Sequence, residues 1–195
     1  MVLAAVLVVA AALYRLAPHP QNFAPLSAIA LCGGLFLSRR NSFWIVLGMM
    51  VFTDLTENIF KWHGQYGLFP VEVFGHYAGF LIALALGWRL RRNSASQGRQ
   101  EVPVPAVLGS TIAASALFFL VTNFVSWLDN PAYPKTLAGL WQSYTIGLPG
   151  YPSTLVFFGR TLASDLAFVA LFLAVIQLAR RGLPETRFSF LLRPA

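Results

Sequence analysis

The stretch "FFGRTLASDLAFVA", residues 157–170, places an arginine and an aspartate inside an apolar run that continues to about residue 179. The run is long enough to cross a bilayer, where an ionised side chain costs about 2.5–3.5 kcal/mol on insertion scales. Five residues turn an α-helix by about 140°, so Arg160 and Asp165 do not pair within it. Asp165 is too short to reach the interface and is expected to face other helices. Arg160 is expected to extend outward or to meet a ligand or Glu72.

The hypothesis for Asp165 is structural: its carboxyl group ties helices together beneath a pocket whose wall includes Arg160. Thr161 shares the helical face of Asp165, and Ser115 and Thr111 of an earlier apolar segment lie at a similar depth. Proton coupling is the alternative, because ionisable groups inside membranes often mark proton pathways.

The composition of the chain is that of a membrane protein. Of 195 residues, 57% are hydrophobic and 11% are charged, whereas a soluble domain averages about 25% charged residues. The mean hydropathy is +0.65. The sequence predicts an all-α, polytopic helix bundle with one integral membrane domain over residues 1–195. Helices are expected because lipid offers no partners to backbone polar groups, and the alternation typical of a barrel is missing.

Six membrane spans are predicted. A signal peptide is the competing interpretation of the first one, but the nearby charge, Arg15, follows the apolar run instead of preceding it. The predicted spans cover about 2–16, 25–38, 43–59, 71–90, 105–127 and 152–179.

The net charge is +7, and the positions of the positive residues indicate the topology. Lys61 lies in the connection after the third predicted span and Lys135 in the connection after the fifth, and Arg15 lies at the end of the first span. The positive-inside rule therefore places both termini in the cytoplasm and predicts a multi-pass protein of the cytoplasmic (inner) membrane, in contact with the lipid bilayer and not with nucleic acid. The other connections and the C-terminal tail hold Arg39, Arg40, Arg89, Arg91, Arg92, Arg99, Arg180, Arg181, Arg187 and Arg193.

The predicted outer connections are rich in aromatic and polar residues. The segment "TLAGLWQSYTIGLPG", residues 136–150, predicts a short interfacial helix with Trp141 and Tyr144 on one face. An aromatic belt at the interface and a lid over a binding site both remain open. The outer set comprises His19, Asn22, Trp62, His63, Tyr66, Asp129, Tyr133, Trp141, Tyr144 and Tyr151.

Two polar residues share a face at the start of the fourth predicted span. Glu72 and His76 are four residues apart, a spacing that places them side by side on a helix. Two ligands are too few for a metal site without others, and no metal site is expected. A pair that contacts a ligand and a polar pair near lipid headgroups remain open.

Further polar residues lie in the third and fifth predicted spans. Asp54 and Asn58 are one turn apart beside Glu57, and Asp54 is deep enough to be expected in the bundle interior. Asn123 and Trp127 share a face, and an amide with an indole suits a flat polar ligand. Helix–helix hydrogen bonding by Asn123 is the alternative.

Several kinds of chemistry lack their motifs. The chain has no G-x-x-x-x-G-K-[ST] sequence for ATP, no H-E-x-x-H sequence and no recognised nucleophile motif. Its single cysteine, Cys32, excludes a disulfide framework and is interpreted as a small apolar helix residue. No cofactor and no catalytic residue is expected.

Five stretches carry a resemblance to a known family: "NFAPLSAIALCGGLFL", "MVFTDL", "FLVTNFVSWL", "YPKTLAGL" and "ASDLAF". Over residues 20–180 the chain resembles an uncharacterised bacterial family of transport membrane proteins. That family is similar in turn to the S components of energy-coupling factor transporters.

The resemblance implies a six-helix protein that captures a small, vitamin-like nutrient from the outer side. It also implies a partner, a transmembrane T component with its ATPases. The matching positions are Asn22, Asp54, Asn123, Tyr133 and Asp165. With the residues singled out above, the predicted substrate-binding set is Asn22, Asp54, Glu72, His76, Asn123, Trp127, Tyr133, Trp141, Tyr144, Arg160 and Asp165.

Two other classes of function remain open. One is a membrane-embedded enzyme that uses intramembrane carboxylates, or Glu72 and His76, as acid and base. The other is a structural membrane subunit without a ligand.

The charge pattern makes a prediction about topology. Reporter fusions after Arg92 and after Arg181 are expected to be cytoplasmic, and a fusion near Asn130 external, because arginines concentrate in alternate connections. Paired alkaline phosphatase and fluorescent protein fusions measure this directly. An external reporter after Arg92 would contradict the predicted topology.

Overall fold

The computed structural model describes residues 2–61, 63, 71–99 and 101–182, and its regular elements there are all helices. The predicted outer residues Trp62 and Tyr66, and the tail residues Arg187 and Arg193, lie outside the described part. The helices are α1 (Val2–Tyr14), α2 (Leu26–Phe36), α3 (Arg39–Phe60), α4 (Val71–Ser96), α5 (Val104–Asp129), α6 (Leu137–Tyr144) and α7 (Thr154–Gly182).

Four of these helices, α3, α4, α5 and α7, are long and apolar enough to cross a membrane. They indicate a multi-pass membrane protein. Helices α1 and α2 have 13 and 11 residues. At about 1.5 Å per residue they are roughly 20 Å and 17 Å long, against a hydrocarbon core of about 30 Å. The expectation of six spans is therefore not confirmed: all six apolar helices form, but 2–16 and 25–38 are too short to span individually.

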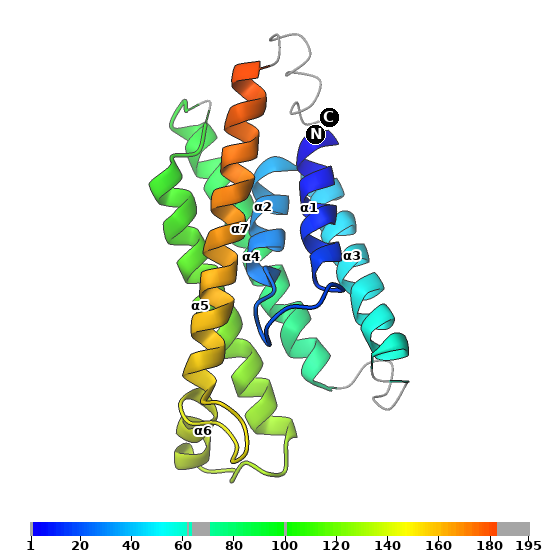
Figure 1. The fold of residues 1–195 in the computed structure, drawn as a ribbon. Helices are drawn as coiled ribbons and strands as arrows, with labels where there is room; N and C mark the ends of the chain where they lie inside the picture. The colour runs from blue at the N-terminus through cyan, green and yellow to red at the C-terminus, as the bar shows by residue number, and fades with distance from the viewer. Residues whose placement is uncertain (1, 62, 64–70, 100, 183–195) are drawn as a thin grey trace.

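The short helices pair as a hairpin, with α2 in the interior of the bundle and α1 packed against α2 and α3 with one face exposed (Figure 1). The connection between them, residues 15–25, lies partway along the bundle, while α3, α5 and α7 continue past it. We call the end that holds the α2–α3 and α4–α5 connections the arginine end, after Arg39, Arg40, Arg89, Arg91 and Arg92. The opposite end, which holds α6, is the far end.

Helix boundaries follow local sequence signals. The side chain of Ser38 accepts a hydrogen bond from the Asn41 N–H at the start of α3, and that of Thr136 accepts one from the Gly139 N–H at the start of α6. The predicted short helix in residues 136–150 is thus present as α6. Helix α2 begins after Pro25, which supplies no capping side chain of its own.

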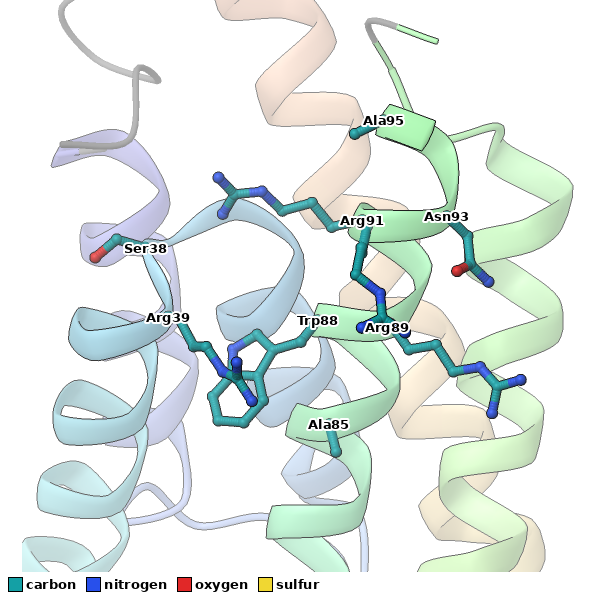
Figure 2. A pocket seen from close by; sticks show the side chains of 9 residues that line it. Ser38, Arg39, Ala85, Trp88, Arg89, Arg91, Asn93 and Ala95 are labelled. Atoms are coloured by element: carbon teal, nitrogen blue, oxygen red, sulfur yellow. The ribbon is translucent and has the colours of Figure 1, made fainter. Parts of the chain in front are cut away.

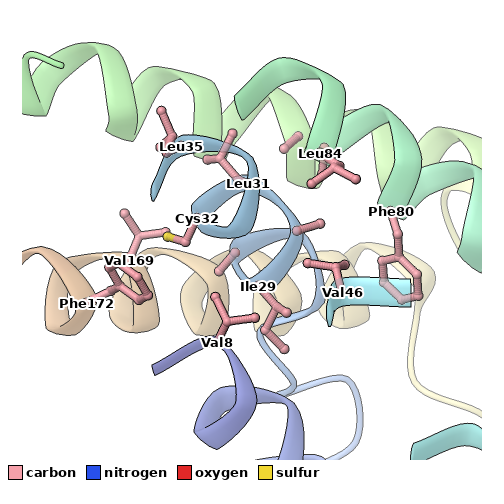
Figure 3. Close-up of a cluster of buried hydrophobic side chains, with 14 of the residues drawn as sticks. Val8, Ile29, Leu31, Cys32, Leu35, Val46, Phe80, Leu84, Val169 and Phe172 are labelled. Atoms are coloured by element: carbon pink, nitrogen blue, oxygen red, sulfur yellow. The ribbon is translucent and has the colours of Figure 1, made fainter. Parts of the chain in front are cut away.

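Helix α2 is the centre of the core. Every residue from Ser27 to Leu35 is buried. Its side chains face neighbours on several sides: Leu31 faces Leu84, and Cys32 lies toward Val169 and Phe172 (Figure 3). Cys32 is therefore a packing residue in the described structure.

Two glycines bring the backbones of α2 and α4 into contact. A Cβ atom on Gly34 would lie 2.5 Å from the Leu84 carbonyl oxygen, and one on Gly87 would lie 2.4 Å from the Leu31 carbonyl oxygen. Backbone atoms cannot move aside as a flexible side chain can, so both positions require glycine. Small residues allow such close packing between helices in membranes.

We predict that Gly34→Ala lowers the free energy of unfolding by about 1–3 kcal/mol, because the added methyl group forces α2 away from α4. Thermal unfolding of the purified protein in detergent measures the change. Gly48→Ala is the matched control, since a Cβ atom there meets nothing within 4 Å. An unfolding temperature for Gly34→Ala as high as that of the control would contradict the close contact.

Candidate functional site

A cavity of about 770 Å³ lies between the α1–α2 connection and the four long helices. The connection forms its floor with Arg15, His19, Gln21, Asn22 and Ala24, together with Leu26, the first residue of α2. The walls come from α3 (Glu57, with Lys61 beyond its end), α4 (Glu72, His76), α5 (Phe118, Phe119, Thr122, Asn123, Ser126), the segment before α7 (Tyr151) and α7 (Thr154, Phe157, Phe158, Thr161).

The floor is a non-helical segment fixed by specific contacts. The ring of His19 stacks on Tyr14 with centroids 5.6 Å apart, and its Nε2 lies 3.1 Å from the Arg15 carbonyl oxygen. Asn22 has a φ of 59°, a left-handed conformation that asparagine tolerates. Its carbonyl oxygen accepts a hydrogen bond from Thr161 Oγ1 at 3.1 Å. Irregular backbone at membrane depth is tolerated where it lines a polar cavity, which is its position here.

One side of the floor is held by a half-buried ion pair. Arg15 Nη2 lies 2.8 Å from Asp54 Oδ1, and Arg15 Nη1 donates to Thr53 Oγ1 at 2.6 Å. The Tyr77 hydroxyl donates to the other oxygen of Asp54 at 2.9 Å, and Glu57 Oε2 lies 3.8 Å from Arg15. Asp54 therefore lies in the bundle interior, as its depth predicts. It holds Arg15 at the cavity and does not itself line the cavity.

The other side of the floor rests on Asp165. This side chain is fully buried. Its Oδ1 accepts a hydrogen bond from the Ala28 N–H at 2.9 Å, and its Oδ2 accepts one from Ser115 Oγ at 2.7 Å. Ala28 lies in the first turn of α2, where N–H groups have no partner within the helix. Asp165 of α7 thus caps α2, and the expectation that it faces other helices, with Ser115 at its depth, is confirmed.

Two wall residues have unused polar groups. Among the described residues, the side chains of Glu72 and His76 make no hydrogen bond and no ion pair, although both residues line the cavity. The ring of His76 stacks on Phe118 with centroids 5.8 Å apart. Asn123 donates through Nδ2 to the Phe119 carbonyl oxygen at 2.9 Å, which leaves its Oδ1 as an acceptor.

Four aromatic residues of the predicted binding set lie at or near the far end of the molecule but outside the cavity: Trp127 in α5, Tyr133 in the loop after it, and Trp141 and Tyr144 in α6. The indole of Trp127 donates to the Pro134 carbonyl oxygen at 2.9 Å, and the hydroxyl of Tyr144 donates to the Leu120 carbonyl oxygen at 3.0 Å. Tyr133 is buried, and burial raises the pKa of its hydroxyl, which stays neutral. Trp141 is 70% exposed. None of these four aromatic residues lines the cavity.

Arg160 also lies outside the cavity. Its guanidinium is 6.0 Å from the ring centroid of Phe157, and the side chain is half-buried. The predicted contact with Glu72 does not form in the described structure, and Arg160 is not among the residues that line the cavity. The structure therefore brings Asn22, Glu72, His76 and Asn123 together at one cavity.

The sequence prediction missed two features of the cavity. One is Arg15, which it treated only as a charge at a helix end. The need of Asp54 for a buried cation could have pointed to it. The other is the apolar wall made by the adjacent pairs Phe118–Phe119 and Phe157–Phe158. Paired aromatic residues are common in apolar spans, so the pattern alone carries no signal.

A family model described as a family of unknown function, DUF6580, matches residues 1–186. The chain belongs to DUF6580. No curated protein and no solved structure matches the chain. The DUF6580 match includes every residue of the cavity and both of its supports, Asp54 and Asp165.

The geometry of Asp165 makes a prediction that separates two roles. Asp165→Leu is expected to lower the free energy of unfolding by about 1–3 kcal/mol, because the buried Ala28 N–H loses its acceptor. Asp165→Asn is expected to unfold close to the wild-type temperature. Its Oδ1 can accept from Ala28, and its Nδ2 can donate to Ser115 Oγ, which itself donates to the Thr111 carbonyl oxygen at 3.0 Å.

Thermal unfolding measures the stability of the two variants, and mass spectrometry of copurified small molecules shows whether each variant retains a ligand. A normal unfolding temperature for Asp165→Asn together with loss of a ligand that the wild type retains would contradict the structural role and favour proton coupling.

Proposed function

We propose that this DUF6580 protein captures a small polar molecule in the cavity above the α1–α2 connection and takes part in its transport. The observation that carries the proposal is that Glu72 and His76 face a cavity of about 770 Å³ without hydrogen-bond partners among the described residues. Ligand sites typically have about 300–1,000 Å³ and a few convergent polar groups on apolar walls. Most of the wall residues belong to the long helices α3, α4, α5 and α7, which favours a rigid site.

The lining suggests the chemistry of the ligand. The phenylalanine pairs offer flat apolar faces, whereas Glu72 and the Asn123 Oδ1 accept hydrogen bonds. Arg15 is neutralised by Asp54, with Glu57 also near. Glu72 therefore favours a ligand with an N–H donor or a positive charge. A small ringed molecule with amino groups, of the size of a vitamin, meets these requirements.

The proposal for transport rests on the helices and the charge pattern. If the protein lies in the inner membrane, the positive-inside rule places its arginine end on the cytoplasmic side. The cavity then lies on the outer side of the α1–α2 connection. The sequence has no ATP motif, so energy would come from a partner. The resemblance to S components suggests a T component with ATPases for that role.

A membrane-embedded enzyme is the second candidate, and Glu72 and His76 are the observation that favours it. They lie on one helical face in the same cavity, where a carboxylate and an imidazole can act as base and acid. Turnover of a bound molecule by purified protein, lost in both Glu72→Gln and His76→Gln, would favour this candidate over capture alone.

The first test is mass spectrometry of small molecules that copurify with the protein in detergent. We expect one ringed, donor-bearing compound in near-stoichiometric amount. Glu72→Gln is expected to weaken its binding about 10- to 100-fold, since a hydrogen bond to a charged group contributes about 1.5–3 kcal/mol. Asn123→Ala is expected to weaken it about tenfold.

Trp127→Ala is the matched control for Asn123→Ala. Both residues lie near the far end of α5, but Trp127 does not line the cavity. Unchanged binding in Trp127→Ala with weaker binding in Asn123→Ala supports the cavity. Equal binding by Asn123→Ala, Glu72→Gln and the wild type would rule the cavity out as the ligand site.

A further inference from the structure

Four arginines surround a second cavity, of about 610 Å³, at the arginine end of the molecule (Figure 2). Arg39 comes from the first turn of α3, and Arg89, Arg91 and Arg92 come from the last turns of α4. The nine residues that line the cavity include no carboxylate. Within the described part of the chain, none of the four arginines forms an ion pair. The positive potential in this cavity is therefore not neutralised by the protein.

Two of these arginines are held in place by their neighbours. The guanidinium of Arg39 lies 4.9 Å from the ring centroid of Trp88, whose Nε1 donates to Ser42 Oγ at 2.8 Å. Figure 2 shows Arg39 and Trp88 lying against each other between α3 and α4. Arg91 Nη1 donates to the Leu37 carbonyl oxygen at 2.6 Å. Fixed side chains lose little entropy when a ligand binds.

Helix α3 adds to the positive potential. Its 22 residues begin at this cavity, and Ser38, its N-cap residue, lines the cavity. The N-terminus of a helix carries a partial positive charge and unpaired N–H groups, which attract phosphate. The cavity thus combines a helix start with planar guanidinium groups, which suit phosphate oxygens.

Next to this cavity, α3 and α4 pack against each other through apolar side chains. The space between them holds only about 10 Å³, so an acyl chain does not enter it. Trp44 of α3 and Leu81 of α4 are instead exposed apolar side chains further along the two helices, where a lipid tail would lie outside the bundle. A charged cavity at the end of two long apolar helices matches a molecule with a phosphate head whose hydrocarbon tail stays in the bilayer.

We infer that the arginine cavity binds the phosphate headgroup of an anionic phospholipid whose acyl chains stay in the bilayer beside α3 and α4. Free phosphate shares the headgroup chemistry but has no acyl chains to hold it in the bilayer. Basic pockets between helices at a membrane surface favour anionic headgroups. The site is separate from the cavity at the α1–α2 connection and does not depend on the function proposed for it.

Native mass spectrometry of the wild-type protein tests the site without any substitution. The protein is equilibrated in detergent with equal amounts of phosphatidylglycerol and phosphatidylcholine of the same chain length. We expect one phosphatidylglycerol to be retained in preference to phosphatidylcholine. Equal retention of the two lipids would overturn the inference.

Charge-matched variants locate the site. The double variant Arg39→Gln with Arg92→Gln is expected to weaken phosphatidylglycerol binding roughly thirtyfold, because each arginine near an anionic surface contributes about fivefold to the affinity. The control is Arg40→Gln with Arg99→Gln, which removes the same charge from the same end but from residues that do not line the cavity. Equal weakening by the two double variants would show a general charge effect and overturn the site.

A third arm distinguishes the two sources of phosphate. Inorganic phosphate and glycerol 3-phosphate are added to wild-type protein, and the unfolding temperature is compared with that in phosphatidylglycerol micelles. We expect stabilisation by the lipid and little by the soluble phosphates at equal concentration. Equal stabilisation by inorganic phosphate would overturn the assignment to a lipid.

Discussion

The carboxylate of Asp165 is the interaction on which the interior of this protein depends. It joins α7 to the first turn of α2 and to Ser115 of α5. Helix α2 is buried along its length and begins after a proline without a capping side chain. Without this acceptor from α7, the Ala28 N–H would be buried and unpaired, at a cost of about 1–3 kcal/mol. Asp165 therefore determines where α2 can begin.

The position of α2 in turn determines the floor of the cavity. The α1–α2 connection is held at one side by Arg15 on Asp54 and Thr53, and at the other by Thr161 on the Asn22 carbonyl oxygen. Each anchor belongs to a long helix. The two carboxylates, half-buried Asp54 and fully buried Asp165, thus support a segment of irregular backbone from opposite sides, and that segment lines a polar cavity.

Much of this arrangement follows from local sequence. A carboxyl group deep in an apolar run must find partners, which predicts that Asp165 faces other helices. Glu72 and His76 share a face because they are four residues apart. The length of the first two helices was harder to predict. Pro18, Pro20 and Pro25 lie in the connection between them and interrupt the helical structure. The apolar residues on either side nevertheless predict two membrane spans.

Other features depend on contacts that no sequence pattern shows. Trp127 and Tyr144 donate to backbone carbonyl oxygens, which turns them away from the cavity. Arg160 lies against the ring of Phe157 and does not itself line the cavity. Small rotations of a helix decide such outcomes, and side-chain packing determines those rotations. The two facing phenylalanine pairs are likewise ordinary in an apolar span until the fold brings them together.

The shortness of the α1–α2 hairpin has an electrical consequence. Exposed polar residues such as Gln21 and Asn22 line the cavity, so water and ions reach the floor. In a bilayer, the insulating layer at this place is then about as thick as α1 is long, roughly 20 Å instead of about 30 Å. The transmembrane voltage, which acts with about 2.3 kcal/mol per elementary charge per 100 mV, falls mainly across the hairpin. A charged group at the floor would therefore lie almost at one end of the field, and a charge at the arginine end of the hairpin would lie almost at the other.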